Sequence, residues 1–238
     1  MSEKGFSGRL ALVTGATAGL GRAVSLALAS AGAHVIAVGR KKQGLEALDD
    51  EIRALGGEAT LAPLDLTKGA GIDELGGVIF ERWKKLDILV GNAGILGPMS
   101  PLSHVPPKQW QEVIDINLTA NFRLIRSMDT LLRASEAGRA VFITSNITRG
   151  SRAYWGPYAA SKAALEMLVL TYAAETRQSA LKVNLVNPGA MRTSMRAKAY
   201  PGEDPKTLAT PEQIAPKILP LLRPEFDQTG QRFDVADM

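Results

Sequence analysis

The stretch RLALVTGATAGLG, residues 9–21, joins an apolar run to a glycine-rich turn and then to a helical pattern. The apolar run is typical of a buried strand. Gly15 permits a tight turn, Gly19 lets the backbone approach a pyrophosphate at a helix N-terminus, and Gly21 allows close helix packing. The spacing is G-x-x-x-G-x-G rather than G-x-G-x-x-G. The stretch therefore predicts a strand–turn–helix unit that is suited to a dinucleotide phosphate.

Apolar runs and helical patterns alternate along the rest of the chain, which indicates parallel β-α-β units. The sequence shows no linker and no internal repeat. We therefore expect one α/β domain over residues 1–238, a doubly wound parallel sheet (Rossmann fold) of about seven strands with helices on both faces. The predicted strands are 9–15, 33–40, 58–65, 87–94, 139–145, 181–189 and 230–235. The predicted helices are 20–32, 42–55, 71–84, 108–135 (with an interruption near 117), one containing 158–162 and running to about 179, and 210–223.

Composition excludes several classes of function. The chain has 238 residues, 45% hydrophobic and 22% charged, and no cysteine, so a disulfide framework and a zinc-thiolate site are excluded. With only two histidines, we expect no metal site. The net charge of +4 is spread along the chain, so no nucleic acid partner is expected. The chain lacks a signal-peptide pattern and any run of 18 apolar residues, which predicts a cytoplasmic protein with no membrane partner.

Polar side chains follow several of the predicted strands, at the edge of the sheet where such folds bind ligands. Arg40 follows the second strand, where an acidic residue would favour NAD, and a guanidinium there favours the 2′-phosphate of NADP. The alternative is a surface arginine. Asp65 follows the third strand and either accepts the adenine amino group or caps the next helix. Asn92-Ala93-Gly94, Ser145 and Asn187-Pro188-Gly189 follow the next three strands.

Tyr158 and Lys162, in YAASK, are four residues apart in a predicted helix, so both side chains lie on one face. A fixed positive charge favours the phenolate, so we expect Lys162 to lower the pKa of Tyr158 toward the working range. A tyrosine at the edge of the core and a lysine in water are the alternative, because the pattern alone is common.

These pieces together resemble the short-chain dehydrogenase/reductase family, over about residues 8 to 235. The matching segments are TGATAGLG (14–21), Asp65, NAG (92–94), Asn117 in INLTA, Ser145 in ITS, YAASK (158–162) and PGAMRT (188–193). The chain departs from many members at Gly91, where a second Asn is common, and before Gly19, where many NADP-preferring members carry a basic residue.

The resemblance implies hydride transfer between a nicotinamide and a carbonyl/alcohol pair. It makes Tyr158 the general acid/base and Ser145 the partner of the substrate oxygen. It implies that Lys162 binds the nicotinamide ribose and lowers the pKa of the phenol. It also implies that the backbone carbonyl of Asn117 holds a water. The cofactor is NADP(H) in preference to NAD(H). The implied cofactor contacts are Gly15, Thr17, Gly19, Leu20, Gly21, Arg40, Asp65, Leu66, Asn92, Ala93, Gly94, Tyr158, Lys162, Pro188, Gly189 and Thr193.

Several alternatives stay open at this stage. Thr193 either binds the nicotinamide carboxamide or caps a short helix. Arg149, Arg152 and Arg192 are candidates for an acidic substrate group. The resemblance implies a homo-oligomer, tetramer or dimer, through the helix bearing Tyr158 and the helix before it. A catalytically silent sensor that binds NADP(H) is the alternative function.

Overall fold

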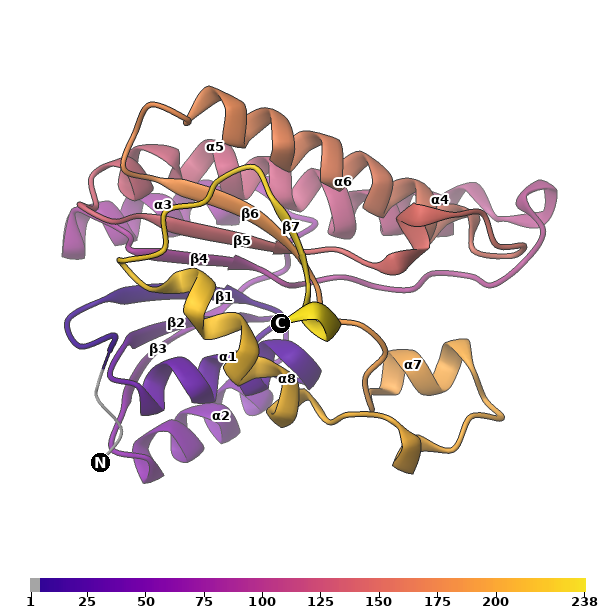
Figure 1. Ribbon diagram of the computed structural model, residues 1–238, viewed down its shortest axis with the longest axis horizontal. Coiled ribbons are helices and arrows are strands. Elements are labelled where there is room, and N and C mark those ends of the chain that lie inside the picture. Colours follow the sequence, from indigo (N-terminus) through magenta and orange to yellow (C-terminus); the bar gives the residue numbers. More distant parts are fainter. Residues whose placement is uncertain (1–4) are drawn as a thin grey trace.

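Seven parallel strands form a single sheet in the computed structural model, which describes residues 5–238 (Figure 1). The strand order is β3-β2-β1-β4-β5-β6-β7, so the direction of winding reverses between β1 and β4. Ligands bind at such a switch point in doubly wound folds. The predicted fold class is confirmed. The strands are β1 (Leu10–Thr14), β2 (His34–Gly39), β3 (Glu58–Pro63), β4 (Ile88–Gly91), β5 (Arg139–Ile143), β6 (Lys182–Asn187) and β7 (Arg232–Asp234).

Helices cover both faces of the sheet, and Figure 1 shows α1, α2 and α8 on one side and α3, α5 and α6 on the other. Each side buries its own apolar cluster against the strands, as expected for strands apolar on both faces. No helix among the described residues is long and apolar enough to cross a membrane. The helices are α1 (Gly19–Ser30), α2 (Lys42–Ala54), α3 (Gly69–Trp83), α4 (Pro107–Ile114), α5 (Ala120–Arg133), α6 (Gly156–Glu175), α7 (Ser194–Ala199) and α8 (Pro211–Ile218).

Three segments differ from the sequence prediction. The third strand was predicted over residues 58–65, but β3 ends at Pro63, and it is an edge strand that pairs only with β2 and is half-buried along most of its length. The last helix ends at Ile218 rather than 223, and a 3-10 turn that contains Pro220 follows it. Proline cannot donate the backbone hydrogen bond that a longer α-helix would need. The short helix α7 was not among the predicted helices.

The long pattern over residues 108–135 divides as expected. A single π-helical turn, Asp115–Thr119, separates α4 from α5 and contains Asn117. Turns of this kind insert one residue into a helix and often mark functional sites. The interruption therefore lies at the residue for which the sequence predicted it.

The amino-terminal edge of the sheet is closed by a charged cluster around Asp87, just before β4. Its carboxylate accepts hydrogen bonds from the Leu10 amide at 2.9 Å, the Ser135 hydroxyl at 2.5 Å and the Lys85 ammonium at 3.1 Å. Burial alone raises the pKa of Asp87, but the hydrogen bonds from Ser135, Leu10 and Lys85 outweigh it, so the pKa is lowered. This edge is filled by protein groups, and the open site lies at the opposite edge.

Candidate active site

A cleft of about 1020 Å³ runs along the carboxyl ends of the strands. It is lined by nearly all the residues for which the sequence predicted a role; the exceptions are Gly21, Asn117 and Arg149. The predicted residues that line the cleft are Gly15, Thr17, Gly19, Leu20, Arg40, Asp65, Leu66, Asn92, Ala93, Gly94, Ser145, Tyr158, Lys162, Pro188, Gly189 and Thr193.

The glycine-rich turn has the geometry that its sequence requires. Gly15 and Gly19 have φ angles of +65° and +53°, a region that side chains disfavour. A Cβ atom on Gly21 would lie 2.3 Å from the Gly15 carbonyl oxygen, so this glycine permits packing and does not touch the cleft. Helix α1 begins at Gly19 with no side-chain cap and no acidic residue in its first turn. Its first backbone N–H groups therefore suit an anionic ligand.

Asn92 holds the glycine-rich turn against β4. Its side-chain amide donates to the Thr14 carbonyl oxygen at 2.8 Å, and the Thr14 hydroxyl accepts from the backbone N–H groups of Asn92 and Ala93, each at 3.0 Å. A Cβ atom on Gly15 would lie 3.0 Å from the Asn92 amide nitrogen. The side chain of Asn92 thus fixes the floor of the cleft, while the small residues after it leave that floor open.

Arg40 and Asp65 lie near each other on the cleft wall. The Asp65 carboxylate accepts from the Thr67 amide at 3.0 Å and the Thr67 hydroxyl at 2.8 Å. These bonds lower the pKa of Asp65, and the charge of Arg40 contributes. The capping alternative for Asp65 is wrong, because the N-cap residue of α3 is Lys68. Within residues 5–238, the exposed Arg40 side chain makes no hydrogen bond or salt bridge of its own.

Ser145, Tyr158 and Lys162 come together on the other half of the cleft. The side chains of Tyr158 and Lys162 are buried, with the ammonium nitrogen 6.0 Å from the centre of the phenol ring. That nitrogen donates to the Ile143 carbonyl oxygen at 2.7 Å, at the end of β5. The Ser145 hydroxyl lies close enough to the phenol of Tyr158 to influence its pKa. Helix α6 therefore delivers the phenol and the ammonium to the end of β5, where Ser145 lies.

The two ionisable groups are shifted in opposite directions. Burial raises the pKa of Tyr158, although the nearby Ser145 hydroxyl works against the rise. Burial lowers the pKa of Lys162 to about 8, and the charge of Glu166 opposes this. We predicted that Lys162 would lower the pKa of Tyr158. The net shift of Tyr158 is instead upward, because desolvation of the phenolate outweighs the opposing influence of Ser145.

Asn117 fixes the relative positions of the cleft floor and α6. Its side-chain amide accepts from the Ile95 N–H at 2.8 Å, and donates to the Ile95 carbonyl oxygen at 2.9 Å and to the Ser161 hydroxyl at 3.0 Å. The Asn117 carbonyl oxygen, freed by the π-helical turn, accepts from the Asn121 side chain at 2.9 Å. The Asn121 side chain therefore competes with the water that this carbonyl oxygen was expected to hold.

Thr193 is the N-cap of α7, because its hydroxyl accepts from the Arg196 N–H at 3.2 Å. The capping alternative for Thr193 is thus confirmed, and the same side chain also lines the cleft.

A polar network that no sequence pattern predicted lies behind Ser145. The Glu166 carboxylate accepts from Arg232 at 2.7 Å, from Thr144 at 2.6 Å and from Thr148 at 2.9 Å. Arg232 also donates to the Ser145 carbonyl oxygen at 3.3 Å. Glu166 lies four residues after Lys162, a spacing that could have been found, whereas Arg232 arrives from the distant strand β7 without any signal in the sequence.

Comparison with known proteins fits this geometry. Residues 9–204 match the model of the family described as short chain dehydrogenase. The chain belongs to that family. It is 40% identical over 230 residues to the uncharacterized oxidoreductase YciK of Escherichia coli (strain K12), an alignment that covers 95% of this chain and 91% of YciK.

Solved structures of the family have the same fold. A Pseudomonas syringae protein described as a short chain dehydrogenase superimposes with a TM-score of 0.95 at 36% identity, covering 98% of this chain and 96% of that one. An Escherichia coli CFT073 protein described in the same way was crystallised with NADPH. It superimposes with a TM-score of 0.92 at 38% identity, covering 99% of each chain.

Proposed function

We propose that this short-chain dehydrogenase is an NADP(H)-dependent oxidoreductase that interconverts a carbonyl and an alcohol, with Tyr158 as general acid and base. The observation that carries the proposal is the buried Tyr158 phenol, which lines the cleft near Ser145 and has the Lys162 ammonium beside its ring. A single domain would hold both the cofactor and the substrate, because one cleft contains all of these groups.

The residues present fit a dinucleotide. The two positive-φ glycines leave backbone N–H groups of α1 open to a pyrophosphate, and a Cβ atom on Gly94 would lie 3.6 Å from the Lys162 ammonium nitrogen. Because Gly94 has no side chain, the space next to the Lys162 ammonium is open to a ribose. When bound, the reduced nicotinamide supplies the hydride.

The chain's own groups handle the proton. In carbonyl reduction, Tyr158 donates its phenolic proton to the substrate oxygen, and the Ser145 hydroxyl stabilises the negative charge that develops there. The Lys162 ammonium then stabilises the phenolate that is left. Because burial raises the pKa of Tyr158, the phenol keeps its proton at neutral pH, which suits an acid. Oxidation of an alcohol needs the phenolate, so we expect its rate to increase with rising pH.

A substrate screen tests the proposal. We expect the protein to consume NADPH with at least one member of a panel of ketones and aldehydes, followed by the absorbance of the reduced nicotinamide. NADH serves as the control cofactor. If the protein binds NADPH and NADP⁺ tightly but turns over none of the carbonyl compounds and none of the matching alcohols, the result would instead support a catalytically silent sensor of the same fold.

The cofactor preference is predicted to depend on Arg40. Arg40→Asp should weaken NADPH binding by about tenfold to a hundredfold, because a charge-assisted contact to the 2′-phosphate is lost and a repulsive charge replaces it. The dissociation constant of NADH should change far less. Both constants are measured by quenching of tryptophan fluorescence.

Lys42→Asp is the matched control for Arg40→Asp. This substitution changes the charge by the same amount two residues away from Arg40. Lys42 pairs with Glu46 at 3.4 Å and does not line the cleft. Equal losses for NADPH and NADH in Arg40→Asp, or an equally large NADPH loss in Lys42→Asp, would refute the role of Arg40.

We also propose a homo-oligomer that pairs through α5 and α6. These helices expose large apolar side chains, with Phe122 48%, Met167 66% and Leu170 37% exposed. Exposed apolar groups gathered on a surface are typical of a protein interface. Sedimentation of the purified chain at the mass of one protomer would contradict this.

A further inference from the structure

Three arginines line the cleft on the segments around α7 and before α6, and two of them are already engaged. Arg196 makes two 2.6 Å hydrogen bonds to the carboxylate of Glu203. Arg192 donates to two backbone carbonyl oxygens, of Pro205 at 2.7 Å and of Leu208 at 3.4 Å. These contacts hold the segment around α7 in place and leave Arg152 as the arginine to consider.

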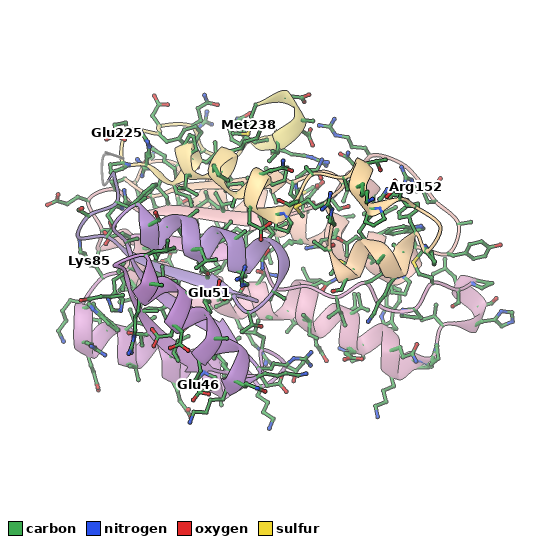
Figure 2. The ribbon with its side chains drawn as sticks, turned by 90° about the horizontal axis from the view of Figure 1, so that it is seen from below. Glu46, Glu51, Lys85, Arg152, Glu225 and Met238 are labelled. Atoms are coloured by element: carbon green, nitrogen blue, oxygen red, sulfur yellow. The ribbon has the colours of Figure 1, made fainter. Side chains whose placement is uncertain are left out.

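Arg152 has a tyrosine as its partner rather than an acid. One of its terminal nitrogens donates to the Tyr200 hydroxyl oxygen at 2.7 Å, and within residues 5–238 no carboxylate lies at salt-bridge distance. The two acidic residues on the cleft wall are elsewhere, Asp65 after β3 and Glu212 in α8. Figure 2 shows Arg152 at the end of the molecule opposite Lys85 and Glu225.

The Arg152–Tyr200 pair offers several donors and no charged acceptor to a ligand. The guanidinium keeps its other N–H groups free, and the Tyr200 oxygen already accepts from Arg152, so its own proton remains to be donated. A planar guanidinium with a neighbouring O–H is well suited to a carboxylate. Since a single unpaired positive charge is present, a monoanion neutralises it better than a phosphate dianion would.

An aromatic wall connects this pair to the proton donor. The Trp155 ring centre lies 5.9 Å from that of Tyr158 and 5.8 Å from that of Tyr200. Met195 and Ala199 of α7 pack against the same small apolar cluster. A flat apolar group can therefore lie along Trp155 with one end at the phenol of Tyr158 and the other at Arg152.

We infer that the substrate is a keto acid or hydroxy acid in which an apolar, ring-sized spacer separates the reacting carbon from a carboxylate held by Arg152 and Tyr200. This assignment rests on the proposed function for the position of the reacting carbon. Of the three arginines that the sequence made candidates for an acidic group, it selects Arg152, because Arg149 pairs with Asp234 at 2.6 Å outside the cleft and Arg192 is bound to the backbone.

The test compares 4-acetylbenzoate with its neutral methyl ester. We expect kcat/KM with NADPH to favour the acid by about tenfold to a hundredfold, the usual range for a hydrogen-bonded charge. Arg152→Ala should remove the preference by weakening the acid alone, and Tyr200→Phe should reduce it in part. Arg149→Ala, which removes the same charge from a residue outside the cleft, should leave it unchanged.

Calorimetric titration of both compounds into the protein saturated with NADP⁺ separates this inference from the proposed function. If the wild type binds the acid selectively and Arg152→Ala abolishes that binding, the inference is supported. If neither compound is turned over, that result counts against the proposed function and not against the inference. Equal binding or turnover of acid and ester overturns the inference and leaves the reductase proposal standing. Absence of binding by both compounds, or an equal loss of preference in Arg149→Ala, also overturns it.

Discussion

Tyr158→Phe is expected to lower kcat for carbonyl reduction by about a thousandfold, within the range for loss of a general acid. The variant removes one hydroxyl from a ring that is 9% exposed and packed against Trp155, so the apolar contacts of the ring remain. The substrate oxygen then develops negative charge without a proton donor, and only the Ser145 hydroxyl remains to stabilise it. Stopped-flow measurement of NADPH consumption under single-turnover conditions isolates this step.

Two controls make the Tyr158→Phe result specific. NADPH binding, measured by fluorescence, should change far less than kcat, because the phenyl ring keeps the shape of the cleft. Tyr154→Phe removes the same atom from a residue that is 57% exposed and does not line the cleft, and it should retain wild-type activity. Full activity in Tyr158→Phe would show that the proton comes from elsewhere and would end the proposed mechanism.

The parts of the fold that local patterns determine could be predicted from the sequence. The apolar strands, the glycine-rich turn at Gly15 and the interruption at Asn117 all depend on residues close together in the chain. The edge position of β3 could not be predicted in this way. Strand order is set by long-range pairing, and within residues 58–65 only Pro63, at the end of the strand, is typical of an edge.

The candidate site shows the same division. Spacing placed Tyr158 beside Lys162, because four residues span one helical turn. It led to the wrong direction for the pKa shift of Tyr158, because burial depends on the whole fold and here raises that pKa. The contact of Arg232 with Glu166 and Ser145 joins β7 to the end of β5 and to α6, and no local pattern marks it.

The charge of Lys162 should control the pH dependence of the reaction. With a pKa of about 8, the ammonium is lost as the pH rises through that value, while Tyr158, whose pKa is raised, still holds its proton. We expect kcat/KM for reduction to fall with an apparent pKa near this value, which belongs to the coupled pair. Lys162→Met should lower kcat/KM by about tenfold to a thousandfold, the effect of removing a charge near a phenolate. It should also remove the fall of kcat/KM on the alkaline limb of the pH profile. Lys162→Arg, always charged, should move the limb to higher pH.

Stability should respond to Lys162 in the opposite sense to activity. Because its folded-state pKa lies below the ordinary value of 10.5, Lys162 binds more protons in the unfolded chain between about pH 8 and 10.5, and its contribution to the free energy of unfolding of the wild type should rise with pH across that window. Lys162→Met lacks the buried charge, so it should be more stable than the wild type at neutral pH and should lack that rise, as measured by urea unfolding at several pH values. A variant that is both less stable at neutral pH and unchanged in its pH–rate profile would mean that the ammonium is a packing element, with no part in tuning the phenol.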